Sequence, residues 1–270
     1  MRATSLGPEP FPASTPWYGE ARTLLERAIR RHGGWSAWQG ATGISLALTS
    51  LTGLLPSAKG AGKTFPVPSR AEIWPRESVA VLHDFPSGGA RGVFSSGHLQ
   101  LLDDRGQVRE EATNHRDSFV GWRRYRRWTP LDALYFFGYA LTHYHTLPFT
   151  LVDAVPLRLR SGRVGGLPLR GVEARIPPLV HTHSSVQTFY FAEDGLLRRH
   201  DYVAEVVGTW ARGAHFWDDF VLVGGLPVAR RRHVLVRLGS IATPIVVLRA
   251  ELGDVRTVSA RSWQPPATPY

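Results

Sequence analysis

The sequence predicts an α+β protein in which one strongly curved antiparallel β-sheet, a half-barrel, wraps around one or two helices. Residues 129–147 are apolar or aromatic nearly all round, and a helix of this kind is normally buried on several sides. The segments before and after it alternate apolar and polar residues in short runs, which is typical of half-buried strands. Short turns join consecutive runs and favour antiparallel pairing.

The central helix has clear start and stop signals. Thr129 suits the N-cap, Pro130 suits the first helical position, and Asp132 places negative charge at the positive end of the helix. The helix should end at Leu147, because a residue before proline avoids the helical region. We expect the strands to wrap around this helix. It is too short, and too polar at its end, to span a bilayer.

The remaining elements follow from turn residues and periodicity. A first helix is expected to open at residues 15–16 and to end at Gly33 and Gly34. Residues 56–69 and 112–128 are expected to be irregular. The expected strands are 44–49, 71–74, 78–83, 92–95, 98–102 and 107–111 before the central helix, and 155–160, 167–175, 186–191, 196–207, 215–223, 228–238, 245–252 and 255–260 after it.

Length and composition fit one domain over residues 15–263, with a flexible arm at 1–14 and a flexible tail at 264–270. The chain contains no cysteine, which excludes disulfides, thiolate nucleophiles and cysteine metal sites. The first residues do not resemble a signal peptide, and no apolar run reaches about 18 residues. We therefore expect a cytoplasmic protein without a transmembrane segment.

The chain is strongly basic, with a net charge of +10 and a pI of about 10.6, mostly from arginine. Such a charge favours acidic partners such as nucleic acid or anionic lipid, and it is also typical of a solvated basic surface. The run from Arg123 to Arg127 alternates with aromatic residues that can stack on bases. A nucleic-acid-binding module is thus one alternative, although not the favoured one. It requires residues 123–127 and 230–232 on one surface.

The sharpest polar cluster lies on the strand expected over residues 196–207. A four-residue hairpin loop at 192–195 would pair Phe191 with Leu196. Counting back then places Gln187 opposite His200. By parity, one wall of the sheet would carry a polar patch of His183, Gln187, His200 and Tyr202. A one-residue change in the loop would instead bring Val186, Thr188 and Tyr190 to this face.

Three roles are open for this patch. His200 can act as a general acid or base assisted by Tyr202, because imidazole titrates near neutral pH. The patch can also be a strand face on solvent, or His200 can be a hydrogen-bonded histidine that holds the sheet together. Further candidates for ligand binding are Tyr135, Tyr139 and His143 along one side of the central helix, and His215 with Asp219 on one strand face. Core packing is the alternative for the helix residues.

The pair His181 and His183 has a spacing that suits zinc. Because neither cysteine nor a nearby carboxylate completes a ligand set, we expect neither a metal nor a cofactor.

Three stretches together resemble a family of uncharacterised bacterial proteins: AIRRHGGWSAW (28–38), ALYFFGYALTHYHTLPF (133–149) and FYFAEDGLLRRHDYVAEVVG (189–208). The arrangement is also similar to the LolA/LppX-like half-barrel group. Members of that group carry lipid-modified proteins or lipids in a sheet wrapped over helices. The resemblance implies an apolar cavity.

The sequence therefore predicts a binding protein for a hydrophobic or amphipathic small molecule or lipid, held between the sheet and residues 129–147. The runner-up is a small-molecule enzyme of the cyclase, isomerase or hydrolase type, with His200 as general acid or base in the same cavity. Both interpretations require Leu134, Phe137 and Leu141 to face inward and the hollow to retain free space.

Overall fold

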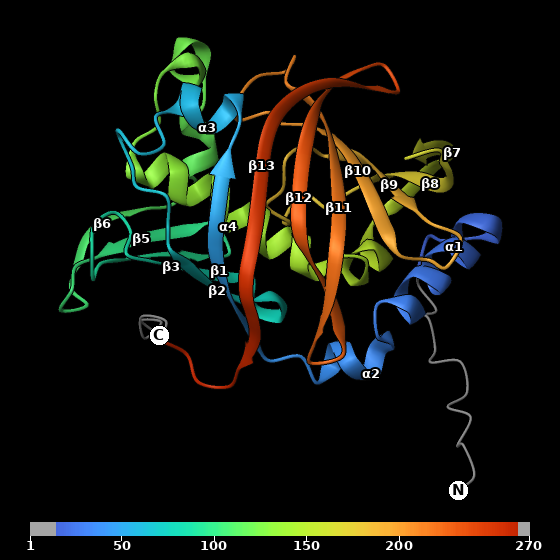
Figure 1. The fold of residues 1–270 in the computed structure, drawn as a ribbon, viewed down its shortest axis with the longest axis horizontal. Helices are drawn as coiled ribbons and strands as arrows, with labels where there is room; N and C mark the ends of the chain where they lie inside the picture. Colours follow the sequence, from blue (N-terminus) through green and yellow to red (C-terminus); the bar gives the residue numbers. More distant parts are fainter. Residues whose placement is uncertain (1–14, 264–270) are drawn as a thin grey trace, which may run out of the picture.

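The computed structural model describes residues 15–263, so the arm expected at 1–14 and the tail expected at 264–270 lie outside the described residues. Within this range the chain forms one antiparallel sheet of 13 strands and four α-helices (Figure 1). The sheet curves around the longest helix, so the fold class predicted from the sequence is confirmed.

The sheet consists of two meanders. The first comprises β1 (Gly43–Thr52), β2 (Arg70–Trp74), β3 (Val79–His83), β4 (Arg91–Ser95), β5 (His98–Leu102) and β6 (Val108–Ala112). The second comprises β7 (Val155–Val164), β8 (Leu167–Arg175), β9 (Val186–Phe191), β10 (Leu197–Val203), β11 (Arg212–Val223), β12 (Leu226–Leu238) and β13 (Ile241–Val258). Consecutive strands pair within each meander, and β1 pairs with β13 to join the two.

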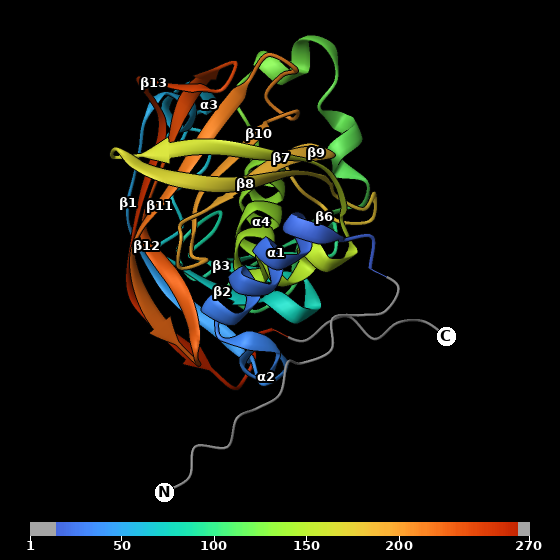
Figure 2. The same ribbon diagram turned by 90° about the vertical axis from the view of Figure 1, so that its right-hand side faces the viewer.

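The connection between the meanders explains the buried helix. β6 and β7 are the two edges of the sheet, and α4 (Pro130–Thr146) leads from one to the other. It lies in the hollow of the sheet (Figure 2), where strands of both meanders surround it. The helix has no polar face because no side of it is left to solvent.

The boundaries of α4 agree with the sequence prediction to within one residue at each end. The Thr129 hydroxyl accepts a hydrogen bond from the Asp132 amide at 3.2 Å, and the Asp132 carboxylate accepts one from the Thr129 amide at 2.9 Å. This reciprocal pair is a capping box. At the other end Leu147 is extended, with ψ of 140°, and Pro148 follows.

Close packing between α4 and the sheet depends on Gly138. A Cβ at this position would lie 2.4 Å from the Cβ of Phe94 on β4. Only a residue without a side chain allows the helix to approach the strand so closely.

The N-terminal helices cover the second meander. α1 (Gly19–Arg31) begins later than the expected residues 15–16, and α2 (Gly34–Gln39) follows it. The apolar side of α1, with Leu24, Leu25 and Ile29, packs against the 3-10 segment η4 (Phe149–Asp153) and strands β8 and β9. This packing closes the end of the hollow at which the second meander begins.

Two further expectations about local structure were wrong. Residues 56–69 are not wholly irregular, since α3 (Leu54–Lys59) extends into them; Pro56 is tolerated because it lies in the first helical turn. The strands expected at 245–252 and 255–260 are one strand, β13, whose bulges against β1 and β12 interrupt the alternation.

The segment 112–128 contains the short 3-10 turns η2 (His115–Ser118) and η3 (Gly121–Tyr125), and η1 (Pro75–Glu77) separates β2 from β3. Among the helices of residues 15–263, none combines the length and the apolar character that a membrane span requires.

Candidate functional site

A cavity of about 410 Å³ lies between α4 and the middle of the sheet. Its walls are the inner faces of β1, β11, β12 and β13, one side of α4, the helix α3 and the loop that follows β10. Cavities of roughly 300–1,000 Å³ are typical of small-molecule sites. The hollow of the sheet is therefore not packed solid.

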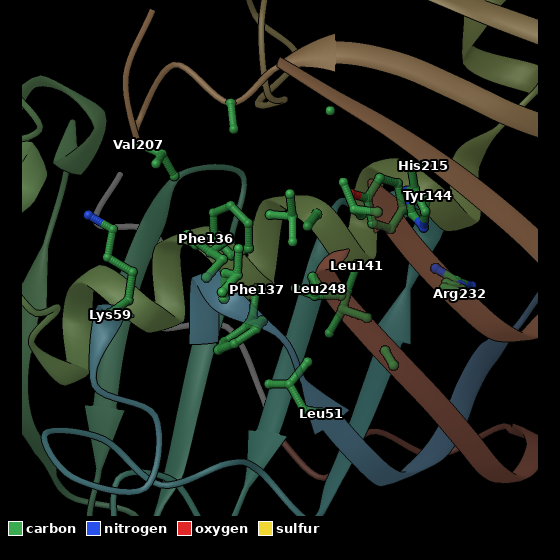
Figure 3. Close-up of a pocket in the computed structure, with 18 of the residues that line it drawn as sticks. Leu51, Lys59, Phe136, Phe137, Leu141, Tyr144, Val207, His215, Arg232 and Leu248 are labelled. Carbon is green, nitrogen blue, oxygen red and sulfur yellow. The ribbon is translucent and has the colours of Figure 1, made fainter. Parts of the chain in front are cut away.

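The lining of the cavity is almost entirely apolar. The strands contribute Leu46, Leu48, Val234, Val236, Leu248, Ala250 and Leu252, and the helix contributes Phe136, Phe137, Ala140, Leu141 and Tyr144. Phe137 and Leu141 face the cavity from α4 (Figure 3), and Leu134 is fully buried. The inward-facing residues and the free space required by the sequence prediction are both present.

Three large apolar side chains on the cavity wall are exposed to solvent and mark its mouth. They are Leu54 of α3, Tyr125 of η3 and Trp210 of the loop after β10, with exposed fractions of 59%, 65% and 64%. A rim of this kind gives an apolar guest a contact surface at the entrance.

Lys59 lies at the end of the cavity nearest α3 (Figure 3). Its ammonium donates hydrogen bonds to the main-chain oxygens of Arg124 and Arg126. Burial lowers the pKa of this group. The Lys59 ammonium is therefore engaged in holding η3 against α3.

Arg232 lies at the opposite end, beside Tyr144 and His215 (Figure 3). Its side chain comes from the inner face of β12, and the residue is only 5% exposed. The guanidinium carbon lies 5.5 Å from the ring centre of Tyr144 and 5.1 Å from that of Trp217. Burial lowers the pKa of Arg232 to about 10, so the group remains charged at neutral pH. No carboxylate within residues 15–263 forms an ion pair with it.

His215 is the second polar group at this end. It is buried, and neither ring nitrogen has a hydrogen-bond partner among the described residues. Burial first, and then the positive charge of Arg232, hold the pKa of His215 well below its usual value. The ring is therefore neutral at pH 7 and carries one N–H donor and one acceptor without partners.

A hydrogen-bonded group of side chains lies behind this wall. The Tyr144 hydroxyl lies 2.5 Å from Nε2 of His183 and 3.5 Å from the hydroxyl of Tyr202. The Tyr139 hydroxyl lies 3.0 Å from Nδ1 of the same histidine. Of these, Tyr144 and Tyr202 line the cavity, whereas Tyr139 and His183 support them from behind.

His200 does not reach the cavity. Its Nε2 donates a hydrogen bond to the side-chain oxygen of Gln187, and its ring stacks on Phe189 with 4.6 Å between ring centres. Burial, and then the neighbouring histidines, hold the pKa of His200 well below its usual value. Neither His200 nor Gln187 lines the free space. As arranged, His200 cannot contact a molecule there, so its position favours the structural role over the catalytic one.

The predicted polar patch exists, although the predicted register was wrong. Phe191 pairs with Leu197, one residue later than expected, and a bulge after Leu197 adds a second offset. His200 is consequently opposite Phe189 and not opposite Gln187. Two offsets of one residue restore the original parity, which is why Gln187 and His200 still share a face.

Tyr135, Tyr139 and His143 were expected to face a ligand, and none of them lines the cavity. Residues 136, 137, 140, 141 and 144 occupy the side of α4 that faces the cavity. With 3.6 residues per turn, positions 135, 139 and 143 must then face the segment 181–187. Tyr135 accordingly bonds Nδ1 of His181 at 3.0 Å, and burial lowers the pKa of His143 to about 4.

Asp219 is not part of the site. Its backbone within β11 has a positive φ of +54°, although the register with β12 continues unchanged past it. Its carboxylate pairs with Arg230 at 2.9 Å and lies 3.7 Å from Arg231. Within residues 15–263, no group of three or more histidine, aspartate or glutamate side chains is arranged to hold a metal ion.

The surface required by the nucleic-acid alternative is incomplete. Arg232 is buried in the cavity, so residues 230–232 do not share one face. In the other run Arg123 pairs with Asp132 at 3.0 Å, and the Arg126 guanidinium lies 4.7 Å from the ring of Trp122. These contacts stabilise the segment that leads into α4.

The fold and the cavity define a half-barrel with an apolar pocket between its sheet and its helix. No family model and no curated protein matches the sequence. Among solved structures, the chain is similar to a LolA superfamily protein from Nitrosomonas europaea, with 11% identity, a TM-score of 0.49, and 90% and 96% of the two chains covered.

A DUF1329 family protein from Desulfovibrio piger is similar at 14% identity, with a TM-score of 0.45 over 89% and 94% of the chains. The lipoprotein LppX from Mycobacterium tuberculosis is similar at 13% identity, with a TM-score of 0.26 over 87% and 95%. Two of these structures, the LolA superfamily protein and LppX, belong by their names to the half-barrel group that the sequence resembles. At such identities the likeness concerns the fold alone.

The sequence interpretation anticipated Tyr202 and His215 among the residues that line the cavity and missed Tyr144, Arg232 and the exposed rim. A signal for Arg232 was present, because it has the same strand parity as Val234 and Val236. A charged residue in register with core-facing valines indicates a buried charge. The rim comes from three separate segments, and no local pattern connects them.

Proposed function

We propose that the protein binds an apolar or amphipathic small molecule, such as a lipid, in the cavity between α4 and the sheet. The observation that carries this proposal is the free space of about 410 Å³ in the middle of a 13-stranded sheet, enclosed by leucine, valine and phenylalanine side chains. Empty apolar space forfeits packing energy. A guest that fills it recovers van der Waals contacts and removes its own apolar surface from water.

The shape of the site supports the same proposal. Exposed apolar residues at the mouth lead to an apolar interior, and Tyr144, His215 and Arg232 form a polar group at the far end. Ligand sites commonly combine an apolar lining with a few polar groups that orient the ligand. The guest enters at Leu54, Tyr125 and Trp210 and extends along α4.

Native mass spectrometry of the protein purified from its own host tests the proposal directly. We expect a mass increment that is lost on delipidation and whose fragments identify an apolar or amphipathic molecule. A delipidated sample should also bind a fluorescent apolar dye such as 1-aminoanthracene.

A matched pair of variants locates the dye. Leu248→Trp fills the cavity from β13, whereas Leu159→Trp adds the same side chain at an exposed strand position. The first change should reduce dye affinity by about tenfold or more, and the second should leave it unchanged. Equal dye binding by both variants would place the bound dye elsewhere and contradict the proposal.

A further inference from the structure

The charge at the deep end of the cavity is unbalanced. Arg232 is a buried cation on the wall of an apolar space, and it makes no ion pair within residues 15–263. Buried charges in proteins are normally paired, because removal of an ion from water is costly. The other buried arginine of the sheet, Arg199, follows this rule and pairs with Asp201 at 2.7 Å.

The hydrogen bonds of Arg232 leave part of its donor capacity free. A guanidinium has five N–H donors. Its Nε donates to the main-chain oxygen of Ala229 at 3.2 Å, and Nη2 donates to Nε2 of His145 at 3.3 Å. His145 accepts there because its Nδ1 donates to the oxygen of Leu141 at 2.7 Å. Both partners are neutral, so the positive charge keeps free donors and has no counter-ion.

His215 places a second unpartnered group at the same point. The ring of His215 lies 4.7 Å from that of Tyr144 and 5.4 Å from that of Trp217, the same two rings that flank the guanidinium of Arg232. A neutral imidazole can donate one hydrogen bond to an anion. A cation and a neutral donor thus meet at the closed end of an apolar space.

From this geometry we infer that the guest is an aliphatic carboxylic acid, bound with its carboxylate at Arg232 and His215 and its chain directed along α4 towards the mouth. The inference rests on the proposed function and names the ligand class of the same cavity. A carboxylate matches the planar fork of a guanidinium and supplies the missing negative charge. The apolar rim at Leu54, Tyr125 and Trp210 then contacts the end of the chain.

A competing arrangement would satisfy Arg232 without a ligand. On another side the guanidinium borders a void of about 20 Å³ next to His145, which is enough for one water molecule. Water satisfies donors and leaves the charge unbalanced. The two arrangements differ in one property, which is whether the cavity distinguishes an acid from a neutral molecule of the same length.

Titration of delipidated protein with dodecanoate and with dodecanol tests that property, with dye displacement and calorimetry as readouts. We expect dodecanoate to bind about ten- to one-hundredfold more tightly than dodecanol. Arg232→Met should abolish the preference while dodecanol still binds, which also shows that the variant is folded. Arg232→Lys should retain part of the preference, because it keeps the charge and loses the fork.

Arg249→Met is the matched control, since Arg249 is an exposed arginine of β13 that does not line the cavity. It should leave the preference unchanged. Arg212 lines the cavity two residues from Trp210, and loss of the preference in Arg212→Met and not in Arg232→Met would place the carboxylate at the mouth and overturn the inference. Equal affinities for dodecanoate and dodecanol in the unmodified protein would also overturn it, with the proposed function left standing. Failure of both molecules and the dye to bind would overturn the proposed function itself.

Discussion

The imidazole of His183 lies flat against the phenol ring of Tyr202, with 3.8 Å between the ring centres and 7° between the ring planes. Tyr202 is part of the cavity wall, and His183 is bonded to both Tyr139 and Tyr144 of α4. The stacked pair therefore ties the wall formed by β10 to the central helix. The shape of the cavity depends on this buried polar contact as well as on apolar packing.

Replacement of His183 by leucine should destabilise the protein by about 2–4 kcal/mol, because it leaves two buried tyrosine hydroxyls without this partner. Urea denaturation followed by tryptophan fluorescence measures the change. His181→Leu is the control: it removes the hydrogen bonds to Tyr135 and to the main chain of Ser96 at a half-buried position, and should cost about 1 kcal/mol. A His183→Leu variant as stable as the control would contradict the role assigned to the stacked pair.

Acidification should destabilise the protein between about pH 6.5 and pH 4. Burial lowers the pKa of His143 to about 4 and that of His145 to about 3. Below pH 6.5 the unfolded chain takes up protons that the folded protein cannot accept. The free energy of unfolding therefore decreases as the pH is lowered. His143 alone contributes roughly 3 kcal/mol across this window. Urea midpoints at several pH values measure the slope.

The variant His143→Gln should show a smaller slope over the same range, because it removes one of the titrating groups. Burial raises the pKa of Glu72, but hydrogen bonds from His83 and Ser262 outweigh it and lower this pKa to about 2. The contribution of Glu72 is therefore lost only below about pH 4.5, so the slope between about pH 6.5 and pH 4.5 is free of it. A flat profile from pH 7 to pH 5 would show that the buried histidines are already hydrated or charged.

The buried pair Arg199 and Asp201 on the other face of β10 should behave as a unit. The guanidinium bonds both carboxylate oxygens, at 2.7 and 2.9 Å, and lies over the rings of Tyr190 and Phe216. Arg199→Met alone should cost about 3–5 kcal/mol, because it removes both hydrogen bonds to the buried Asp201 carboxylate and leaves only the longer ion pair with Arg237 at 3.6 Å. The double change Arg199→Met with Asp201→Leu should cost distinctly less. A double-mutant cycle by urea denaturation measures the coupling, and additive losses would refute it.

Gly138→Ala should destabilise the protein by about 1–3 kcal/mol, although alanine normally favours a helix. The added methyl group would overlap Phe94 on β4 and displace α4 from the sheet. Gly40→Ala is the control, because Gly40 also has a helical backbone and its nearest neighbour is at 3.4 Å. Thermal denaturation of the two variants measures the difference. Equal melting temperatures would mean that the helix is not held tightly against the sheet.

Much of the local structure could be predicted from the sequence. The cap at Thr129 and the stop at Pro148 act through backbone groups within a few residues, so the limits of α4 were accurate. Strands β8 and β9 agree with the prediction residue for residue. The shared face of Gln187 and His200 was right for a partly accidental reason, since two register offsets cancelled.

The sequence by itself determined the elements, their apolar faces and the buried helix, because those depend on contacts between residues close in the chain. Only the tertiary structure decided that β1 pairs with β13 some 200 positions later, with Ser50 opposite Glu251. That single pairing joins the two meanders around α4 and leaves the hollow beside it. Arg232 and His215 are already close in the hairpin of β11 and β12. The tertiary structure decides that Tyr144 of α4 packs against both side chains and that no carboxylate of residues 15–263 pairs with Arg232, because the charge balance of a buried site depends on which distant segments pack against it.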